Sequence, residues 1–174
     1  MAIYSESQID EMAMSLLTET DLLSIPVDVY KIAQYKGFSL FQHQLDHGVS
    51  GLIVANDKVI RGFNSKKVMV VNESDSPLRK RFTIAHELGH YVLAGSPEQC
   101  YAHRDVGDYG QEERDANRFA SALLMPKEDI MKEVARVKEK YPLAPNSFII
   151  VEIAQAFLVS ENAAEVRLKK LDLI

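Results

Sequence analysis

Two histidines and a glutamate stand close together in the stretch RFTIAHELGHYVLAG, which runs from Arg81 to Gly95. His86 and His90 are four residues apart, so on a helix their rings project from the same face and can hold one metal ion through their nitrogens. Glu87 lies about 100° round the helix from His86, which places its carboxylate beside such a metal, where it can polarise a water molecule. The H-E-x-x-H pattern therefore predicts a hydrolytic zinc site.

The same trio also has a purely structural interpretation, a hydrogen-bonded histidine pair in a protein core. With five histidines in the chain, a chance match is about a one per cent event by composition. Two imidazoles and a carboxylate on a mostly apolar helix are costly to bury without a compensating role, so metal binding is favoured. Gly89 inside the motif costs about 1 kcal/mol in helix propensity. We expect it to admit the close approach of a neighbouring strand or of a substrate.

A catalytic zinc needs a third protein ligand and one position open to water. Four downstream residues carry suitable groups: Glu98, His103, Asp105 and Asp108. The stretch QEERDANRFASALLMP also has an apolar face at helical spacing, made by Ala116, Phe119, Ala120, Leu123 and Leu124. Glu112 and Glu113 both lie within about 50° of the centre of that face, whereas Asp115 points away from it. Periodicity leaves Glu112 and Glu113 tied as the third ligand, and either is also an ordinary helix-start carboxylate.

The elements that must position these groups fall into three regions. Residues 1–36 have the spacing of two helices, the first of them amphipathic. Residues 38–73 are predicted to form four short strands, FSLFQHQL, VSGLIVAN, KVIRGFN and VMVVNE, with a hairpin turn at ANDKV. Residues 76–174 are predicted to be helical again. The predicted fold class is α+β, with a small, twisted, mostly antiparallel sheet packed on the motif helices. We expect a metallopeptidase core over 1–130 and an all-helical extension over 131–174.

The boundaries of the motif helix are marked by residues that favour helix ends. Ser76 suits the N-cap and Pro77 the first helical position. Gly95, with a proline two residues later, suits the end.

Composition excludes several classes of protein. A length of 174 residues, of which 47% are hydrophobic, fits one domain with a real core. The net charge of −5 argues against a chain-wide attraction to nucleic acid. No apolar run is long enough to span a membrane, and the stretch MAIYSESQIDEM has no features of a secretion signal. The single cysteine, Cys100, excludes an intramolecular disulfide and fits a reducing compartment, so a cytoplasmic location is expected.

The block FTIAHELGHYVL followed by ERDANRFASALLMP resembles the ImmA/IrrE family of metallo-endopeptidases. The second block matches that family's pattern E-x-x-A-N-x-F-A-x-x-L-L-M-P. Carried over residue by residue, the resemblance makes His86, His90 and Glu113 the ligands of one Zn²⁺ per chain and Glu87 the general base. Asn117 falls where such sites often keep a hydrogen-bond partner for a ligand histidine.

The resemblance extends loosely over residues 25–174 and implies a zinc-dependent endopeptidase that cuts a specific regulatory protein. Relatives of this kind typically act on a helix-turn-helix repressor encoded beside them, in mobile-element, phage or stress-response settings. A donor for the oxyanion is expected in the loop between the two motif helices, from Tyr101, His103, Arg104 or Tyr109. The alternative is a zinc-containing, non-hydrolytic protein that controls a partner regulator or toxin by binding. Glu87 favours the peptidase, because binding alone needs no base.

The tail IAQAFLVSENAAEVRL resembles the start of many helix-turn-helix DNA readers, with Ser160 as an N-cap. From Ser147 to Ile174, four acidic side chains stand against three basic ones, a net charge of −1. Phosphate contacts need a positive excess on one face. We therefore expect no direct binding of nucleic acid and predict that the tail is a packing element or a platform for a protein substrate.

Overall fold

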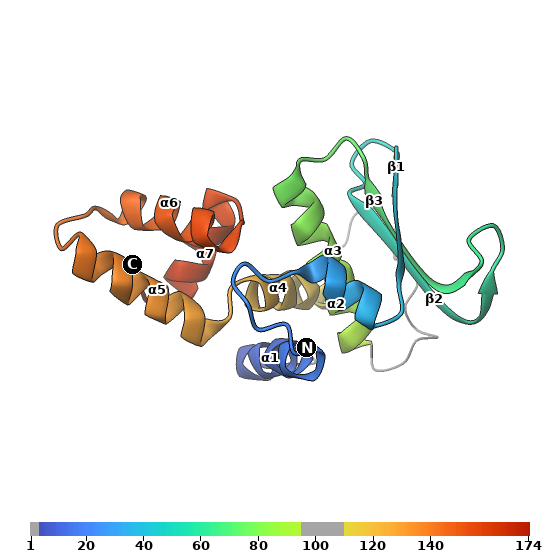
Figure 1. Cartoon of the computed structure of the whole chain (residues 1–174), viewed down its shortest axis with the longest axis horizontal. Helices are drawn as coiled ribbons and strands as arrows, with labels where there is room; N and C mark the ends of the chain where they lie inside the picture. The colour runs from blue at the N-terminus through green and yellow to red at the C-terminus, as the bar shows by residue number, and fades with distance from the viewer. Residues whose placement is uncertain (1–3, 95–109) are drawn as a thin grey trace.

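The computed structural model describes residues 4–94 and 110–174 and confirms the predicted α+β class. The small sheet lies at one end of an elongated molecule and the C-terminal helices at the other, with α3 and α4 between them (Figure 1). The elements are α1 (Glu6–Thr20), α2 (Val29–Tyr35), β1 (Ser39–His43), β2 (Gly51–Ile60), β3 (Ser65–Asn72), α3 (Pro77–Leu93), α4 (Gln111–Leu124), α5 (Lys127–Lys140), α6 (Asn146–Phe157) and α7 (Glu161–Lys170).

The sheet has the strand order β1-β3-β2, with β1 parallel and β2 antiparallel to β3, so it is mixed. The predicted hairpin turn at ANDKV is wrong, because the second and third predicted strands form the single strand β2. The chain turns later, where Gly62 and Asn64 adopt positive φ angles of 90° and 48°. The turn-forming residues after Ala55 instead produce a register shift in β2 between Ala55 and Ile60.

Helices α1 and α2 begin at side-chain caps and cover the core with their apolar faces. The Ser5 hydroxyl accepts a hydrogen bond from the backbone N–H of Gln8, and the Gln8 side-chain oxygen accepts one from the backbone N–H of Ser5. Together they form a complete capping box. The Asp28 carboxylate caps α2, so that helix starts three residues after Pro26. Gly37, at a φ of 84°, follows the end of α2, as its sequence position predicts.

Helix α3 starts as predicted. The Ser76 hydroxyl accepts from the backbone N–H of Arg79, and Pro77 occupies the first turn. The helix ends at Leu93, slightly before the predicted end. Its buried face packs between the sheet and α4, which makes α3 the central element of the molecule.

The C-terminal helices α6 and α7 form the predicted helix, turn and helix, bent by 110°. Arg167 of α7 is only 1% exposed, because its guanidinium donates to the Met125 carbonyl and pairs with Asp10 of α1 at 3.1 Å. The tail is therefore anchored to the start of the chain. Helix α5 runs across the predicted boundary at residue 130, and the division into core and extension stays a prediction. Within the described residues, no single helix has both the length and the apolar composition needed to cross a membrane.

Candidate metal centre

Helix α3 presents both motif histidines on one face, as their spacing predicts. The two Nε2 atoms of His86 and His90 lie 3.0 Å apart, and the rings meet nearly edge to face. Their side chains are 17% and 22% exposed, so the imidazoles are partly buried but still accessible to solvent. Two ring nitrogens converge on a single small volume at the surface of α3.

Helix α4 brings one carboxylate to this volume. Glu113 Oε2 lies 3.3 Å from Nε2 of His86, and Oε1 lies 3.1 Å from Nε2 of His90. Glu112 is exposed to solvent instead. Of the two carboxylates that periodicity left tied, it is therefore Glu113 that lies beside the histidines.

A glycine allows α3 and α4 to cross at this point. A Cβ atom on Gly89 would stand 3.1 Å from the Ala116 carbonyl oxygen and 3.2 Å from the Cβ of Phe119. Any larger side chain would push α4 away, and with it Glu113, which lies one turn before Ala116. The expectation that Gly89 admits a strand or a substrate is therefore wrong, because the close neighbour is helix α4.

These donors fit a divalent metal ion. One ligand atom each from His86, His90 and Glu113 can be chosen within 4.8 Å of one another. Bonds of about 2.0–2.1 Å in a tetrahedral arrangement require donor atoms about 3.3 Å apart, close to the separations that the three side chains already have. Two imidazoles and one carboxylate, with a side left open, form a donor set that suits a catalytic metal.

Asn117, one turn after Glu113, orients one of the histidines. Its Oδ1 lies 3.0 Å from Nδ1 of His86, so a proton on Nδ1 can be donated to it. That tautomer leaves the Nε2 lone pair of His86 directed at the cluster, where a metal ligand needs it. The sequence prediction for Asn117 agrees with this contact.

The charges of the cluster stabilise one another. The hydrogen bond from His86, with the nearby charge of His90, holds the pKa of Glu113 below its ordinary value despite partial burial. Burial is the largest single influence on His86 and lowers its pKa, but the bond to Glu113 and the charges of Glu87 and Glu113 together outweigh it and raise the pKa. Without a metal, the cluster therefore favours a proton shared between imidazole and carboxylate, and a cation is the natural replacement for that proton.

Glu87 lies beside the cluster and is buried beneath the sheet. Its side chain is only 8% exposed, and burial raises its pKa to about 7, against the lowering effect of His86. A Cβ atom on Gly51 of β2 would stand 3.2 Å from Glu87 Oε1 and 2.3 Å from the Thr83 methyl. The start of β2 thus lies directly against the carboxylate, and only a glycine fits there. Sequence reasoning missed Gly51 and Thr83, because no local pattern shows which strand crosses α3.

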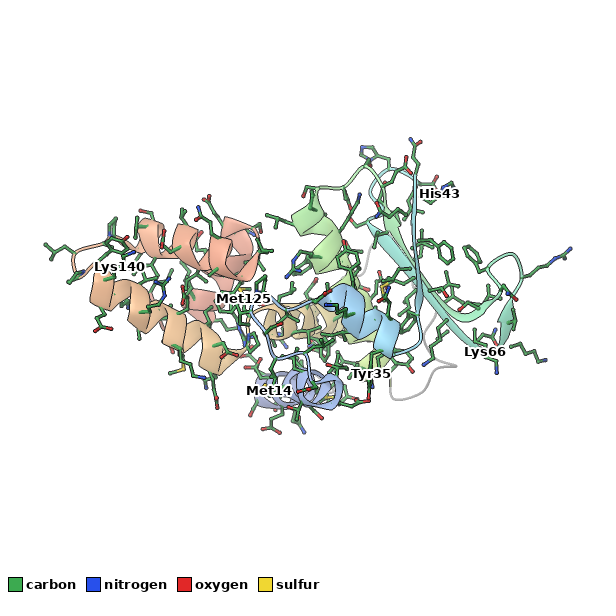
Figure 2. All side chains as sticks on the ribbon, in the orientation of Figure 1. Met14, Tyr35, His43, Lys66, Met125 and Lys140 are labelled. Atoms are coloured by element: carbon green, nitrogen blue, oxygen red, sulfur yellow. The ribbon has the colours of Figure 1, made fainter. Side chains whose placement is uncertain are left out.

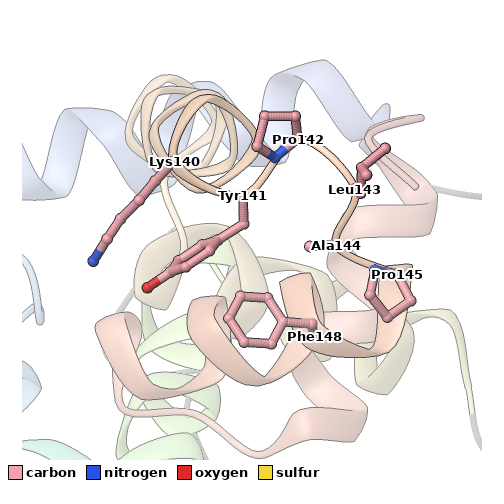
Figure 3. A pocket seen from close by; sticks show the side chains of 7 residues that line it. All are labelled: Lys140, Tyr141, Pro142, Leu143, Ala144, Pro145 and Phe148. Atoms are coloured by element: carbon pink, nitrogen blue, oxygen red, sulfur yellow. The ribbon is translucent and has the colours of Figure 1, made fainter.

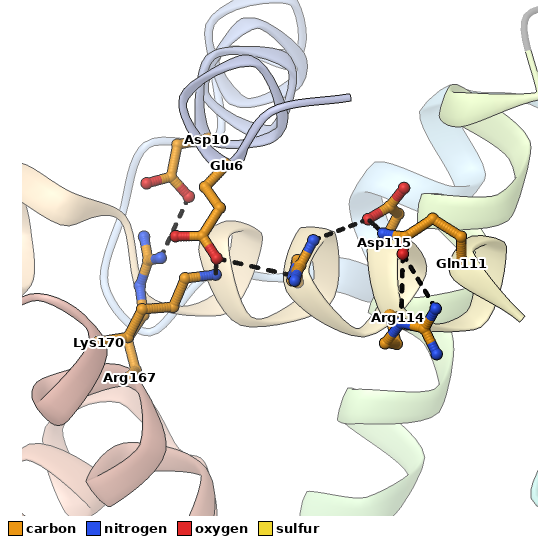
Figure 4. A network of polar contacts seen from close by, with 8 residues as sticks. Glu6, Asp10, Gln111, Arg114, Asp115, Arg167 and Lys170 are labelled. Carbon is orange, nitrogen blue, oxygen red and sulfur yellow. Dashed lines mark hydrogen bonds and ion pairs between the residues drawn. The ribbon is translucent and has the colours of Figure 1, made fainter. Parts of the chain in front are cut away.

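The opposite side of α4 carries a polar network that joins three helices (Figure 4). Asp115 accepts from Gln111 at 2.7 Å and pairs with Arg118 at 3.1 Å, and Arg118 reaches Glu6 of α1 at 3.8 Å. Lys170 of α7 pairs with the same Glu6 at 3.1 Å. Asp115 is predicted to point away from the apolar face of this helix, yet it is only 2% exposed, since α1 packs over that side. Glu113 is therefore carried by a helix that is held from both sides.

Seven residues considered at the sequence level lie outside the described residues: Glu98, Tyr101, His103, Arg104, Asp105, Asp108 and Tyr109. An open apolar depression lies away from the cluster, at the turn between α5 and α6, against Tyr141 and Phe148 (Figure 3). The residues that line it include no carboxylate or imidazole.

Comparisons with known proteins show what the chain resembles. Over 104 residues the chain is 31% identical to the radiation response metalloprotease IrrE of Deinococcus radiodurans, covering 56% of this chain and 29% of that protein. The solved structure of a Mycobacterium tuberculosis transcriptional regulator superposes with a TM-score of 0.62 at 19% identity, covering 94% of this chain and 46% of that one. The chain thus spans less than half the length of either protein.

The family model for Peptidase_M78, the IrrE N-terminal-like domain, matches residues 34–169. The match includes the three converging side chains, the buried glutamate beside them and the helices that position all four. It also confirms the resemblance that the two sequence blocks indicate. The chain belongs to the Peptidase_M78 family.

Proposed function

We propose that this chain is a zinc-dependent endopeptidase that hydrolyses a peptide bond in a specific regulatory protein. The observation that carries the proposal is the convergence of His86, His90 and Glu113, with the buried carboxylate of Glu87 next to them. Family membership supports a peptidase, and the donor set of two imidazoles and one carboxylate supports zinc. A purely structural metal site needs no buried general base beside it, so Glu87 favours hydrolysis over binding alone.

Each residue has a defined role in the proposed reaction. His86, His90 and Glu113 would hold one Zn²⁺ per chain, and such a metal supplies Lewis-acid activation of water and of the substrate carbonyl. Glu87 accepts the proton of the attacking water at its carboxylate and passes it to the leaving amine. Burial, which raises the pKa of Glu87 to about 7, suits this exchange, since a base works best when its pKa lies near the working pH. Asn117 keeps the ring of His86 in one tautomer.

The free edge of β2 offers a path for an extended substrate. The backbone N–H of Asn72 donates to the Ser50 carbonyl, so the peptide groups of Gly51, Ile53 and Ala55 point away from β3. The strand order leaves this side of β2 unpaired among the described strands. A substrate segment that pairs with this edge would pass Gly51, and therefore Glu87.

The proposed substrate is a helix-turn-helix transcriptional repressor encoded nearby, in a stress-response, phage or mobile-element setting. The name of the Deinococcus relative refers to a radiation response, which supports a regulatory role for this chain too. The burial of Arg167 in α7 removes one of the few cations that the tail could offer to DNA, which supports a partner made of protein. A cytoplasmic location is part of the proposal.

The test uses purified protein supplied with Zn²⁺, the co-encoded repressor and casein. We expect cleavage of the repressor at one or few bonds by mass spectrometry, with casein largely intact. The matched control is Glu87→Gln, which should keep the metal and lose the cleavage. Rapid digestion of casein would overturn the specificity, and a Glu87→Gln protein that inactivates its target as well as wild type does would overturn the peptidase in favour of control by binding.

A further inference from the structure

The hairpin that joins β2 to β3 carries a cluster of exposed cations. Lys58, Arg61 and Lys66 are all exposed on it, and Lys66 lies at the end of the molecule remote from the C-terminal helices (Figure 2). None of the three forms an ion pair or a side-chain hydrogen bond with the described residues. A fourth cation, Lys67, is occupied, because its ammonium donates to the Lys36 carbonyl at 2.9 Å and to the Tyr91 hydroxyl at 2.7 Å.

The positive charge is local to this hairpin. Residues 58–67 contain four of the chain's 20 Lys and Arg residues and none of its 25 Asp and Glu residues. The remainder of the chain therefore carries 16 basic against 25 acidic side chains. A short, strongly basic projection on an otherwise acidic protein attracts a short acidic segment and repels an extended polyanion.

Apolar side chains stand beside these cations. Phe41 of β1 and Phe63 of the turn form an edge-to-face pair with ring centroids 5.0 Å apart, and they are 38% and 41% exposed. Val59, near the end of β2, is 56% exposed. Exposed aromatic rings among basic groups are typical of surfaces that bind a partner containing both acidic and apolar residues.

The hairpin is continuous with the catalytic end of the same strand. Strand β2 begins at Gly51, against Glu87, and ends at Ile60, where the hairpin turn starts. At about 3.3 Å per residue, the two ends are up to about 30 Å apart. A segment paired along the free edge of β2 would therefore reach the basic cluster with residues well removed from the cleaved bond.

We propose that Lys58, Arg61 and Lys66, with Phe63, form a binding site for an acidic segment of the protein substrate that contains an aromatic or aliphatic residue. This inference deepens the proposed function: it assigns a site that selects the substrate at a distance from the bond to be cut. The partner is protein rather than nucleic acid, because the site continues the β2 edge and because three cations on an acidic chain neutralise few phosphates.

Lysines on an edge strand also protect sheets against edge-to-edge aggregation. That role would place them along the flat stretch Gly51–Ala55, where the edge is regular. Instead, only Lys58 lies on β2, inside the register shift between Ala55 and Ile60, while Arg61 lies in the turn and Lys66 on the central strand β3. Protection of the edge thus does not explain their position.

The test is a binding measurement on the full chain. The probes are a fluorescein-labelled peptide with glutamates around a phenylalanine and a matched peptide with glutamines in their place. We expect the acidic peptide to bind more tightly by fluorescence anisotropy and to weaken as salt is added. The triple variant Lys58→Gln, Arg61→Gln and Lys66→Gln should lose about tenfold in affinity for the acidic peptide, the sum of three exposed ion pairs. It should bind the neutral peptide as wild type does.

The control removes the same number of charges elsewhere. The control positions Lys31, Lys132 and Lys169 lie on helices, away from the hairpin, with side chains 66%, 72% and 64% exposed. Their change to Gln should leave the peptide affinity unchanged. An equal loss in this control, or equal binding of both peptides to wild type, would overturn the proposal. So would aggregation of the hairpin variant without any loss of peptide affinity, or a labelled oligothymidine that binds the hairpin more tightly than the acidic peptide does.

A charge reversal makes the result independent of folding defects. A variant with Lys58→Glu, Arg61→Glu and Lys66→Glu should prefer a peptide in which lysines replace the glutamates, and absence of this exchange of preference would also contradict the site. All these measurements use binding and not hydrolysis. They therefore decide the inference separately from the peptidase activity, which is judged by cleavage and by the Glu87→Gln control.

Discussion

The contact between β2 and α3 gives a sharp test of how Glu87, the proposed base, is positioned. In Gly51→Ala, the new methyl would stand 2.3 Å from the methyl of Thr83, against an ordinary carbon–carbon contact of about 3.5–4.0 Å. Thr83 is only 4% exposed, and as a β-branched residue in a helix it has few alternative rotamers. The Val70 carbonyl and Glu87 Oε1, both 3.2 Å away, close the other sides. The overlap must therefore move the strand or the carboxylate.

The cost of this substitution follows from these contacts. Overpacking of a closed site typically costs 1–3 kcal/mol, and we expect about 3 kcal/mol for Gly51→Ala because no side is open. Thr83→Ser removes the opposing methyl and by itself costs about 1 kcal/mol of lost burial. In the double variant the closest overlap is gone, so its loss should be about 1–2 kcal/mol instead of the additive sum of about 4 kcal/mol.

The assay is urea unfolding of the four metal-free proteins of this cycle, followed by circular dichroism. We expect a coupling free energy of about 2–3 kcal/mol between residues 51 and 83, such that the double variant loses less stability than the two single variants lose together. Cleavage should be weakest in Gly51→Ala, where Glu87 is displaced, and partly restored in the double variant. Stability losses that add to within about 0.5 kcal/mol would show that the strand does not press on Thr83 as described.

Three further predictions concern the candidate site itself. Glu113→Gln should lose zinc by elemental analysis while Glu112→Gln keeps it, and the reverse would show that the wrong carboxylate was assigned. Glu87→Gln should bind zinc normally and cleave about 10²–10⁴-fold more slowly, whereas loss of zinc would show that this carboxylate is a ligand. In the metal-free protein, burial raises the pKa of Glu87 from 4.5 to about 7, so the native state binds more protons than the unfolded state between those values and stability falls as pH rises through them. Glu87→Gln should therefore stabilise the metal-free protein by up to about 3 kcal/mol above pH 7 in urea unfolding, and a benefit that persists below about pH 4.5 would contradict the protonation argument.

The helical parts of the fold were predictable because their signals are local. Ser76 and Pro77 mark the start of α3 by chemistry that acts within one turn, and the structure places the helix start there. The strands were harder to predict from the sequence. Asn56, a strong turn former, lies inside β2, because pairing with β3 and the register shift override its local preference. Which strands are neighbours, and in which direction, is set by contacts far apart in the sequence.

In the candidate site, too, local features could be predicted from the sequence and contacts between elements could not. The spacing of His86 and His90 predicts a shared face, because both lie on one helix. Periodicity alone could not separate Glu113 from Glu112, since the choice depends on the rotation of α4 against α3. That rotation is set at the contact of Gly89 with Ala116, a pairing between two helices that no periodicity within either of them reveals.

Helix α4 has different neighbours on its two sides, and this explains the order of its polar residues. Glu113 and Asn117, one turn apart, face the histidines of α3, whereas Asp115 and Arg118 face α1. On the opposite side, α4 packs against α1, and Arg118 reaches Glu6, which also receives Lys170 from the tail. Helix α1, which is paired with α7 through Glu6, thus supports the side of α4 opposite Glu113, the carboxylate that lies beside the two motif histidines.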